Sequence, residues 1–220
     1  MKIVCIMSGG MDSSTLVYHY WRNGHNVTAL GFDYGQRHKK ELISAAEICK
    51  GIDVSFTVAD LSRIAPLIAG QSSQLNPDVD VPHGHYAAEN MKQTVVPNRN
   101  MIMLSVAIGH AISEQADAVA YGAHAGDHTI YPDCREEFAC ALDLAAMLCD
   151  WRKVRLLRPF SRIGKHDICA MGDKHGVPFE KTWSCYEGQE VHCGKCGTCV
   201  ERREAFELSN VQDPTIYGAL

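Results

Sequence analysis

The stretch SGGMDS at residues 8–13 combines residue types that could bind a phosphate group. It follows the apolar residues 1–7 and precedes a segment in which Leu16, Val17 and Tyr20 recur at helical spacing. The two glycines therefore stand where a buried strand turns into a helix. The free N–H groups and the dipole of a helix N-terminus attract anions, and glycine lets an anion approach the backbone. We predict a phosphate-binding loop here, and an ordinary capped turn is the alternative.

Four cysteines near the C-terminus have the spacing of a metal site. Three of them lie in the sequence CGKCGTC at residues 193–199, and Cys185 lies upstream. Four thiolates can converge on one tetrahedral ion, and zinc suits them without redox activity. An iron–sulfur cluster, replacement of one thiolate by His192, and unligated thiols are the alternatives. We expect one structural zinc ion per chain, bound by Cys185, Cys193, Cys196 and Cys199.

Two basic residues stand at the beginning of predicted helices. Arg99 and Lys165 both fall in a first helical turn, where a positive side chain is unfavourable with the helix dipole. A bound anion would explain both positions, although a salt-bridged surface arginine is the alternative for Arg99. Both residues are therefore candidates for contact with a negatively charged ligand.

Polar segments follow two of the predicted strands, at the edge where α/β sheets bind ligands. They are DYGQRH at residues 33–38 and GAHAGD at residues 122–127. A turn, YPDC, and a helix come next, and we expect Asp133 to cap that helix. Tyr131 and Arg135 can reach the same cleft, where an arginine beside an aromatic ring would suit a heterocycle that carries a carboxylate.

Apolar periodicity predicts an α/β fold, because strands and helices alternate along the chain. We expect a doubly wound, mostly parallel five-stranded sheet with a small C-terminal zinc-binding subdomain. Residues 71–98 break the pattern, are rich in polar residues and are interpreted as a lid loop. The expected domains are residues 1–180, which bind the nucleotide, and residues 181–220, which hold the cysteine knuckle and a helix. The predicted strands cover residues 1–7, 27–33, 54–58, 118–121 and 154–157.

The composition narrows the class of protein. The 220 residues suffice for one domain with an appendage, and the net charge of −5 comes with acids and bases interspersed. No basic stripe is present, so we expect no direct binding to nucleic acid. Without an apolar run of signal-peptide or membrane-spanning length, we expect a soluble, cytoplasmic protein. The remaining cysteines fall mostly in apolar segments and are expected in the core, namely Cys5, Cys49, Cys134, Cys140, Cys149 and Cys169.

The loop matches neither the Walker nor the dinucleotide signature. It resembles instead the S-G-G-x-D-S loop of the PP-loop ATP pyrophosphatases. The chain as a whole resembles the 7-cyano-7-deazaguanine synthase family. The motifs that carry this resemblance are the loop, residues 33–38, 96–100 (VPNRN) and 131–135, and the cysteines followed by Glu201-Arg202. The resemblance covers nearly the whole chain. It implies a Rossmann-like sheet of the adenine nucleotide α-hydrolase type, and a homodimer.

The resemblance also implies a reaction. ATP activates the carboxylate of 7-carboxy-7-deazaguanine, ammonia captures it as an amide, and a second activation dehydrates the amide to the nitrile. The implied cofactors are ATP and Mg²⁺, besides the zinc ion. The implied cofactor-binding residues are Ser8, Gly9, Gly10, Met11, Asp12, Ser13, Ser14, Asp33 and Gln36. The catalytic candidates are Asp12, Ser13, Asp127 and Lys165, and the substrate candidates are Arg99, Tyr131, Asp133 and Arg135.

Two other functions share parts of this pattern. Another PP-loop ligase or a tRNA-modifying enzyme would have the same ATP loop, but would need a glutaminase partner, a sulfur-carrying cysteine pair or an RNA-binding surface. A non-enzymatic zinc module that binds nucleic acid would use the cysteine knuckle for recognition. The knuckle region has few positive charges, namely those of Lys195, Arg202 and Arg203, which is little for binding nucleic acid. Such a module would also leave the phosphate loop unexplained.

Overall fold

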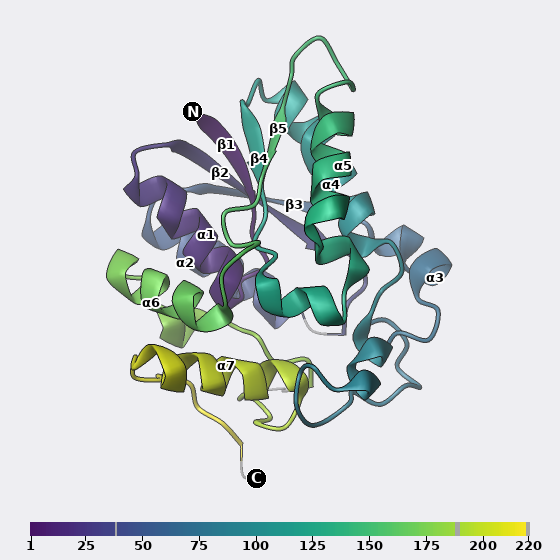
Figure 1. Ribbon diagram of the computed structural model, residues 1–220, viewed down its shortest axis with the longest axis vertical. Helices are drawn as coiled ribbons and strands as arrows, with labels where there is room; N and C mark the ends of the chain where they lie inside the picture. The colour runs from purple at the N-terminus through teal and green to yellow at the C-terminus, as the bar shows by residue number, and fades with distance from the viewer. Residues whose placement is uncertain (38, 188–189, 219–220) are drawn as a thin grey trace.

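A sheet of five parallel strands lies at the centre of the molecule (Figure 1). The computed structural model describes residues 1–37, 39–187 and 190–218; His38, part of the DYGQRH motif, lies outside the described residues. The strand order is β3-β2-β1-β4-β5, and every pair of neighbours is parallel. The strands are β1 (Lys2–Ile6), β2 (Asn26–Asp33), β3 (Ser55–Asp60), β4 (Ala118–Ala120) and β5 (Arg155–Leu157).

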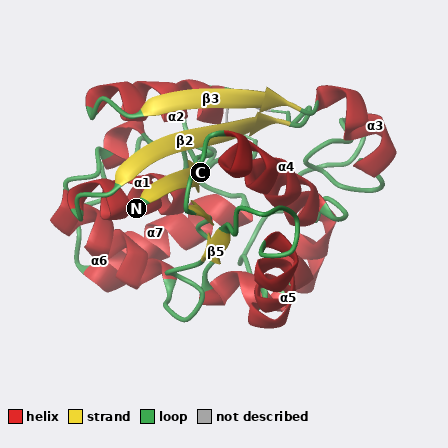
Figure 2. Cartoon of the chain, turned by 90° about the horizontal axis from the view of Figure 1, so that it is seen from above, coloured by secondary structure: helices red, strands yellow, loops and turns green. Residues whose placement is uncertain are grey.

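Helices cover both faces of the sheet, as Figure 2 shows from above. One face packs against α1 (Met11–Arg22), α2 (Lys40–Gly51) and α6 (Lys165–His175), and the other against α4 (Arg99–Ser113) and α5 (Glu136–Ala146). The central strand β1 explains why both faces are covered, since Ile3 and Cys5 face one helical layer and Val4 the other. A central parallel strand is apolar on both sides for this reason. The doubly wound fold predicted from the sequence is therefore confirmed.

The C-terminal helix α7 (Gly197–Ser209) belongs to the same packed structure as the sheet. Ala205 and Phe206 of this helix are buried in the core that α1 and α6 share, and Figure 1 shows α7 beside α6. The cysteines form a separate small core with Val81 and Trp183. The domain boundary expected near residue 180 stays a prediction. None of the described helices is long and apolar enough to cross a bilayer.

The segment between β3 and α4 contains the short helix α3 (Ala65–Ile68), followed by irregular chain and a 3₁₀ helix, Glu89–Thr94. Its irregular part is tied to the rest of the protein. The side chain of Arg37 donates to the carbonyls of Asn76 and Val79, and His83 bridges to Cys196 of the knuckle. The segment thus forms a wall between the sheet and the knuckle, and its role as a lid stays a prediction.

Two of the predicted core cysteines are not in the core. Cys140 and Cys149 are exposed, whereas Cys5, Cys49, Cys134 and Cys169 are buried. Cys140 lies on the outer side of α5, and Cys149 follows the end of that helix. The prediction for these two residues was wrong, because an apolar segment does not by itself say which helix face turns inward.

Candidate active site and metal centre

A cavity of about 290 Å³ opens at the carboxyl ends of β1, β2 and β4. The chain runs from β1 outward to β3 on one side and continues with β4 on the other, so the cavity lies where the strand order reverses. Ligands of open α/β sheets bind at such a point. The cavity is lined by residues of the 8–13 loop, of α4 and of the segment after β4. The C-terminal segment contributes Trp183, Ser184, Tyr186, Gly197, Thr198 and Glu201.

Contacts between Ser8 and Ser13 fix the shape of the loop after β1, and Gly9 takes a position where a side chain would not fit. The Ser13 hydroxyl accepts from the Ser8 N–H at 3.1 Å and lies 3.0 Å from the Ser8 hydroxyl. Gly9 has a φ of +91°, and a Cβ there would lie 2.0 Å from the carbonyl oxygen of Glu41. Helix α1 starts after Gly10 without a side-chain cap, which argues against the capped-turn alternative. The cavity is lined by Ser8, Gly10, Met11, Asp12 and Ser13, but not by Gly9 or Ser14.

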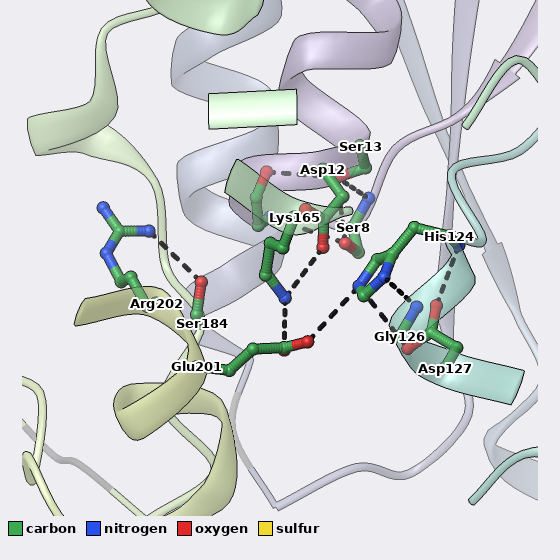
Figure 3. A network of polar contacts seen from close by, with 11 residues as sticks. Ser8, Asp12, Ser13, His124, Gly126, Asp127, Lys165, Ser184, Glu201 and Arg202 are labelled. Atoms are coloured by element: carbon green, nitrogen blue, oxygen red, sulfur yellow. Dashed lines mark hydrogen bonds and ion pairs between the residues drawn. The ribbon is translucent and has the colours of Figure 1, made fainter. Parts of the chain in front are cut away.

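A partly buried network of charges stands beside the loop (Figure 3). The Lys165 ammonium lies 3.1 Å from Asp12 Oδ2 and 2.6 Å from Glu201 Oε2. His124 Nε2 lies 3.6 Å from a carboxylate oxygen of Glu201 and 3.6 Å from one of Asp127. The structure thus brings the predicted residues Asp12, Asp127 and Lys165 together in one cavity.

Burial and pairing have opposite effects on these charges. Burial works to raise the pKa of Asp12, but the positive charge of Lys165 and its hydrogen bond to the carboxylate outweigh it, so the pKa of Asp12 is lowered. Burial likewise works to lower the pKa of Lys165, and the carboxylates of Asp12 and Glu201 outweigh it, so the pKa of Lys165 is raised. Lys165 and Asp12 are therefore both ionised at neutral pH.

The other end of the cavity is aromatic and contains one arginine. The Arg99 guanidinium, from the first residue of α4, donates to the Tyr34 hydroxyl at 3.4 Å and lies 5.7 Å from the centre of the Tyr34 ring. The Tyr131 hydroxyl lies 2.6 Å from Thr94 Oγ1, and Tyr186 also lines this end. An arginine among aromatic rings suits a planar ring that carries a carboxylate.

Glu41, from the first turn of α2, lines the same cavity. Burial raises the pKa of its carboxyl from 4.5 to about 7, although the charge of Arg99 and a hydrogen bond with Gln36 act in the opposite direction. A carboxyl with such a pKa is near half-protonation at neutral pH, so it can either accept or donate a hydrogen bond.

Four of the predicted binding residues have side chains that bond to other parts of the protein. Three of them do not line the cavity. Asp33 is paired with Lys39 at 2.6 Å and does not line the cavity. Gln36 lines it, but its side chain closes the turn after β2, with bonds to the Phe32 carbonyl and the Tyr34 N–H. Asp133 and Arg135 are not among the lining residues, and the Arg135 side chain donates to the carbonyl of His128.

Asp133 caps a different helix from the one expected. Its carboxylate accepts the Asn100 N–H at 3.1 Å, at the beginning of α4. Helix α5 follows Arg135 and has no side-chain cap. The expected local cap was therefore wrong, because the turn at residues 131–135 brings the carboxylate to a helix N-terminus that is distant in sequence.

Cys134 lies in the cavity wall without the features of a nucleophile. Its Sγ accepts from the Asn100 side chain at 3.3 Å, and burial raises the pKa of the thiol. A buried, protonated thiol is inert. The site therefore has no covalent nucleophile at this position.

Sequence reasoning missed several residues of the cavity. The C-terminal segment supplies the most consequential of these, Ser184, Tyr186 and Glu201, together with Glu41 and His124 from other elements. The signal in the sequence was their position next to motifs, since Tyr186 follows Cys185 directly and Glu201 lies on the helix that begins after Cys196.

The four cysteines of the knuckle converge as predicted. Their Sγ atoms all lie within 4.8 Å of one another, with 3.9 Å between Cys185 and Cys196 and 4.0 Å between Cys193 and Cys199. Four sulfurs about 2.3 Å from a tetrahedral ion would be about 3.8 Å apart. Backbone N–H groups of Glu187 and Lys195 point at two of the sulfurs, which favours thiolates. The donor set therefore fits a structural metal ion.

His192 does not join this cluster. Its Nε2 accepts the Ser184 N–H at 3.3 Å, and its ring lies 4.4 Å from that of Trp183. Burial lowers the pKa of His192 to about 4. The histidine therefore packs the knuckle against the cavity wall, and the four sulfurs are the ligands that the geometry offers.

The sheet, the loop at its switch point and the cavity define an α/β fold of the PP-loop type. Among solved structures, a 4-thiouridine synthetase bound to RNA and ATP has a TM-score of 0.55 at 14% identity, over 95% of this chain and 50% of that one. NMN synthetase from Francisella tularensis has a TM-score of 0.54 at 13% identity, over 96% and 77%. At such identities the likeness shows the fold alone.

The chain belongs to the family of the queuosine biosynthesis protein QueC, whose family model matches residues 2–210. It is 50% identical to the 7-cyano-7-deazaguanine synthase of Pseudoalteromonas translucida over 98% of both chains. It is 51% identical to the synthase of Allorhizobium ampelinum, over 99% of this chain and 92% of that one. The relatives support the synthase interpretation over the alternatives of another PP-loop enzyme and a nucleic-acid-binding zinc module.

Proposed function

We propose that this chain catalyses the ATP-dependent conversion of 7-carboxy-7-deazaguanine and ammonia to 7-cyano-7-deazaguanine. The observation that carries the proposal is a single cavity whose two ends differ in chemistry. The curated relatives of the chain are named for this product. One end has the glycine-rich loop and Lys165, which suit phosphates. The other has Arg99 among tyrosines, which suits an aromatic carboxylate.

The proposed reaction proceeds through two adenylate transfers. A carboxylate oxygen of the substrate attacks the α-phosphorus of ATP, and pyrophosphate leaves. Ammonia then attacks the acyl carbon, AMP leaves with that oxygen, and an amide remains after proton loss. The amide oxygen is adenylated in the same way by a second ATP, and loss of AMP and of the nitrogen-bound protons forms the nitrile. Each step converts a poor oxygen leaving group into a good one.

The residues of the loop stabilise the charge that develops on pyrophosphate. Free N–H groups at the beginning of α1 and the Lys165 ammonium supply positive charge where that group departs. Asp12 and Asp127 would hold Mg²⁺, which would offset phosphate charge when bound. Positioning in the enclosed cavity contributes the remainder of the catalysis.

Substrate recognition falls to Arg99 and Tyr131 among the predicted residues, because both line the cavity. Arg99 would pair with the carboxylate and Tyr131 would pack against the ring. Asp133 acts indirectly, since its hydrogen bond to Asn100 fixes the beginning of α4 and hence the position of Arg99. Arg135 holds the turn before α5 through its bond to the carbonyl of His128.

The cysteine cluster is proposed to bind one zinc ion in a structural role, since all four of its positions are filled by protein sulfur. The chain is further proposed to form a homodimer. An apolar surface that a second copy could cover exists at the end of α5, where Leu144, Leu148 and Trp151 are 60%, 85% and 100% exposed. Sedimentation of the purified chain tests this, with a dimer that Trp151→Asp dissociates as the expected result and a monomer as the contradictory one.

Mass spectrometry tests the activity. Purified protein is incubated with 7-carboxy-7-deazaguanine, ATP, Mg²⁺ and ammonium, and the nitrile is followed over time. We expect nitrile with the native chain, and almost none without ATP or with Ser13→Ala. Cys140→Ser, on the outer side of α5, is the matched control and retains activity. Absence of nitrile from protein that binds ATP would refute the substrate assignment.

A further inference from the structure

Arg202 is a fully buried charge without an ion pair. Its side chain is 0% exposed, and no carboxylate of the described residues lies within ion-pair distance of it. Its three hydrogen bonds go to neutral oxygens: Thr215 Oγ1 at 2.7 Å, Ser184 Oγ at 3.2 Å and the Phe179 carbonyl at 2.9 Å. Its Cζ also lies 5.3 Å from the centre of the Phe206 ring. These contacts fix the guanidinium in place but pair its charge with no carboxylate of the described residues.

A buried charge of this kind is costly unless an opposite charge is close. Burial lowers the pKa of Arg202, even though Tyr217, Asp213 and Asp12 act in the opposite direction. Asp12 is already paired with Lys165, and Asp213 accepts from Tyr217 and Thr215. The Arg202 guanidinium thus stands behind one wall of the cavity with no carboxylate of the described residues paired to it, and its charge favours an anionic group in front of that wall.

Ser184 lies between Arg202 and the cavity (Figure 3). Its hydroxyl oxygen accepts from Arg202, so its own proton is left to donate in another direction. The adjacent Trp183 N–H donates to the Gly9 carbonyl at 2.9 Å. Ser184 Oγ lies 4.0 Å from the position that a Cβ on Gly10 would take. The hydroxyl is therefore held directly beside the phosphate-binding loop.

We propose that Ser184 is a further phosphate-binding residue, which donates its hydroxyl proton to the pyrophosphate part of ATP, and that Arg202 positions it. Arg202 donates a hydrogen bond to the Ser184 oxygen, which leaves the hydroxyl proton free to point at the ligand, and its positive charge lies close to the site. Arg202 is thus a positioning residue, since it reaches the ligand through Ser184. The inference rests on the proposed function only in that the 8–13 loop is taken to bind phosphate.

Binding of inorganic pyrophosphate tests the role of Ser184. Titration calorimetry of the full chain with its metal bound, in the presence of Mg²⁺, compares the native protein with Ser184→Ala. We expect affinity to fall about tenfold or more, as for loss of a hydrogen bond to a charged group. Adenosine, which lacks phosphate, should bind both proteins equally. Ser209→Ala is the matched control, because that hydroxyl, at the C-terminal end of α7, bonds the Phe206 carbonyl and the Cys169 thiol and does not line the cavity.

Arg202→Lys tests the positioning, with Arg203→Lys on the same helix as its control. Lysine keeps the charge but not the fork of donors, so Arg202→Lys should weaken pyrophosphate binding and Arg203→Lys should not. In the double variant with Ser184→Ala, the two losses should not add, because both residues act through one hydroxyl. If Arg202→Lys does not fold, Ser184→Ala still decides the proposal.

The outcomes separate this inference from the proposed function. A folded, metal-loaded Ser184→Ala protein that binds pyrophosphate as the native chain does would overturn the inference, even if nitrile synthesis is observed. A chain that makes no nitrile but loses pyrophosphate affinity on Ser184→Ala would overturn the substrate assignment and support the inference. Equal loss for adenosine and pyrophosphate would indicate a general collapse of the wall and would contradict a specific phosphate contact.

Discussion

Lys165 is held between two carboxylates from distant parts of the chain. Asp12 comes from the loop after β1, and Glu201 comes from the helix that the cysteine cluster begins. Glu201 is itself buried, so its charge interacts with Lys165 through a medium less polar than water. The ammonium therefore has a fixed position at the mouth of the loop before any ligand binds.

Glu201→Gln should disturb this position while Glu207→Gln should not. Loss of the charged contact is expected to reduce the free energy of unfolding by about 2 kcal/mol, the usual worth of a hydrogen bond to a charged group. Turnover at saturating ATP should fall roughly tenfold, since Lys165 loses one of its two anchors. Urea unfolding and steady-state kinetics measure both effects. A Glu201→Gln protein with native turnover would show that Asp12 alone positions the lysine.

The carboxyl of Glu41 makes a pH dependence testable. Because burial raises its pKa from 4.5 to about 7 on folding, the folded chain binds more protons than the unfolded chain between these pH values. This group therefore makes stability fall as pH rises through that window, and the loss is complete above pH 7. Glu41→Gln removes the effect, so its stability gain should grow from near zero below pH 4.5 to on the order of 3 kcal/mol above pH 7.

Thermal unfolding at a series of pH values measures this difference. Glu47→Gln, exposed on the same helix and paired with Lys181 at 3.1 Å, is the control and should gain nothing as pH rises. A gain for Glu41→Gln that is the same at pH 5 and pH 8, on either side of most of that window, would contradict the burial of an ionisable carboxyl at this position.

At the scale of elements, the turn from β1 to α1 depends on one glycine more than on the other. Gly9→Ala would place a methyl group 2.0 Å from the backbone of α2 and force an L-residue to a φ of +91°. We expect a loss of about 3 kcal/mol in the free energy of unfolding. Gly10 has a φ of −78°, and the nearest atom to an added Cβ is 3.5 Å away. Gly10→Ala should therefore fold normally.

Urea midpoints of the two variants test this account of the turn. Gly10→Ala should keep the native midpoint and lose affinity for ATP, because its methyl group enters the cavity. Equal midpoints for both alanine variants would mean that the approach of the loop to α2 is not close, contrary to the structure.

The order of the elements was predictable because each has a local signal. The apolar run at residues 1–7 and the helical spacing after Ser13 place β1 and α1, and all five strands were expected within a few residues of their bounds. Helix caps were less predictable, as Asp133 shows. Its nearest helix in sequence is α5, but the folded chain offers it the N-terminus of α4. Only tertiary contacts decide between two such helices.

At the scale of the molecule, the cavity is built from both ends of the chain. The N-terminal loop provides one wall, and residues from the cysteine knuckle provide the opposite one. Asp12 and Lys165 could be predicted from the loop motif and a helix N-terminus. Ser184, Tyr186 and Glu201 could not, because no local pattern says that the knuckle folds back over the loop.

Removal of the metal ion should therefore affect the cavity as well as stability. Loss of the ion from the cysteine cluster releases the segment that carries Ser184 and Glu201. We expect the melting temperature to fall by about 10 °C and pyrophosphate affinity to fall with it. Elemental analysis should find one zinc ion per native chain and less in Cys196→Ser. Cys140→Ser is the control, and a metal-free chain with native pyrophosphate affinity would contradict the coupling.

We propose that both carboxylate oxygens leave the substrate as part of AMP. The most direct test uses 7-carboxy-7-deazaguanine labelled with ¹⁸O at both carboxylate oxygens, with ATP, Mg²⁺ and ammonium. Mass spectrometry then follows the nitrile and the nucleotide together. We expect unlabelled nitrile and two molecules of AMP, each with one ¹⁸O atom, for every nitrile formed. Nitrile accompanied by unlabelled AMP, or no nitrile from protein that binds ATP, would contradict it.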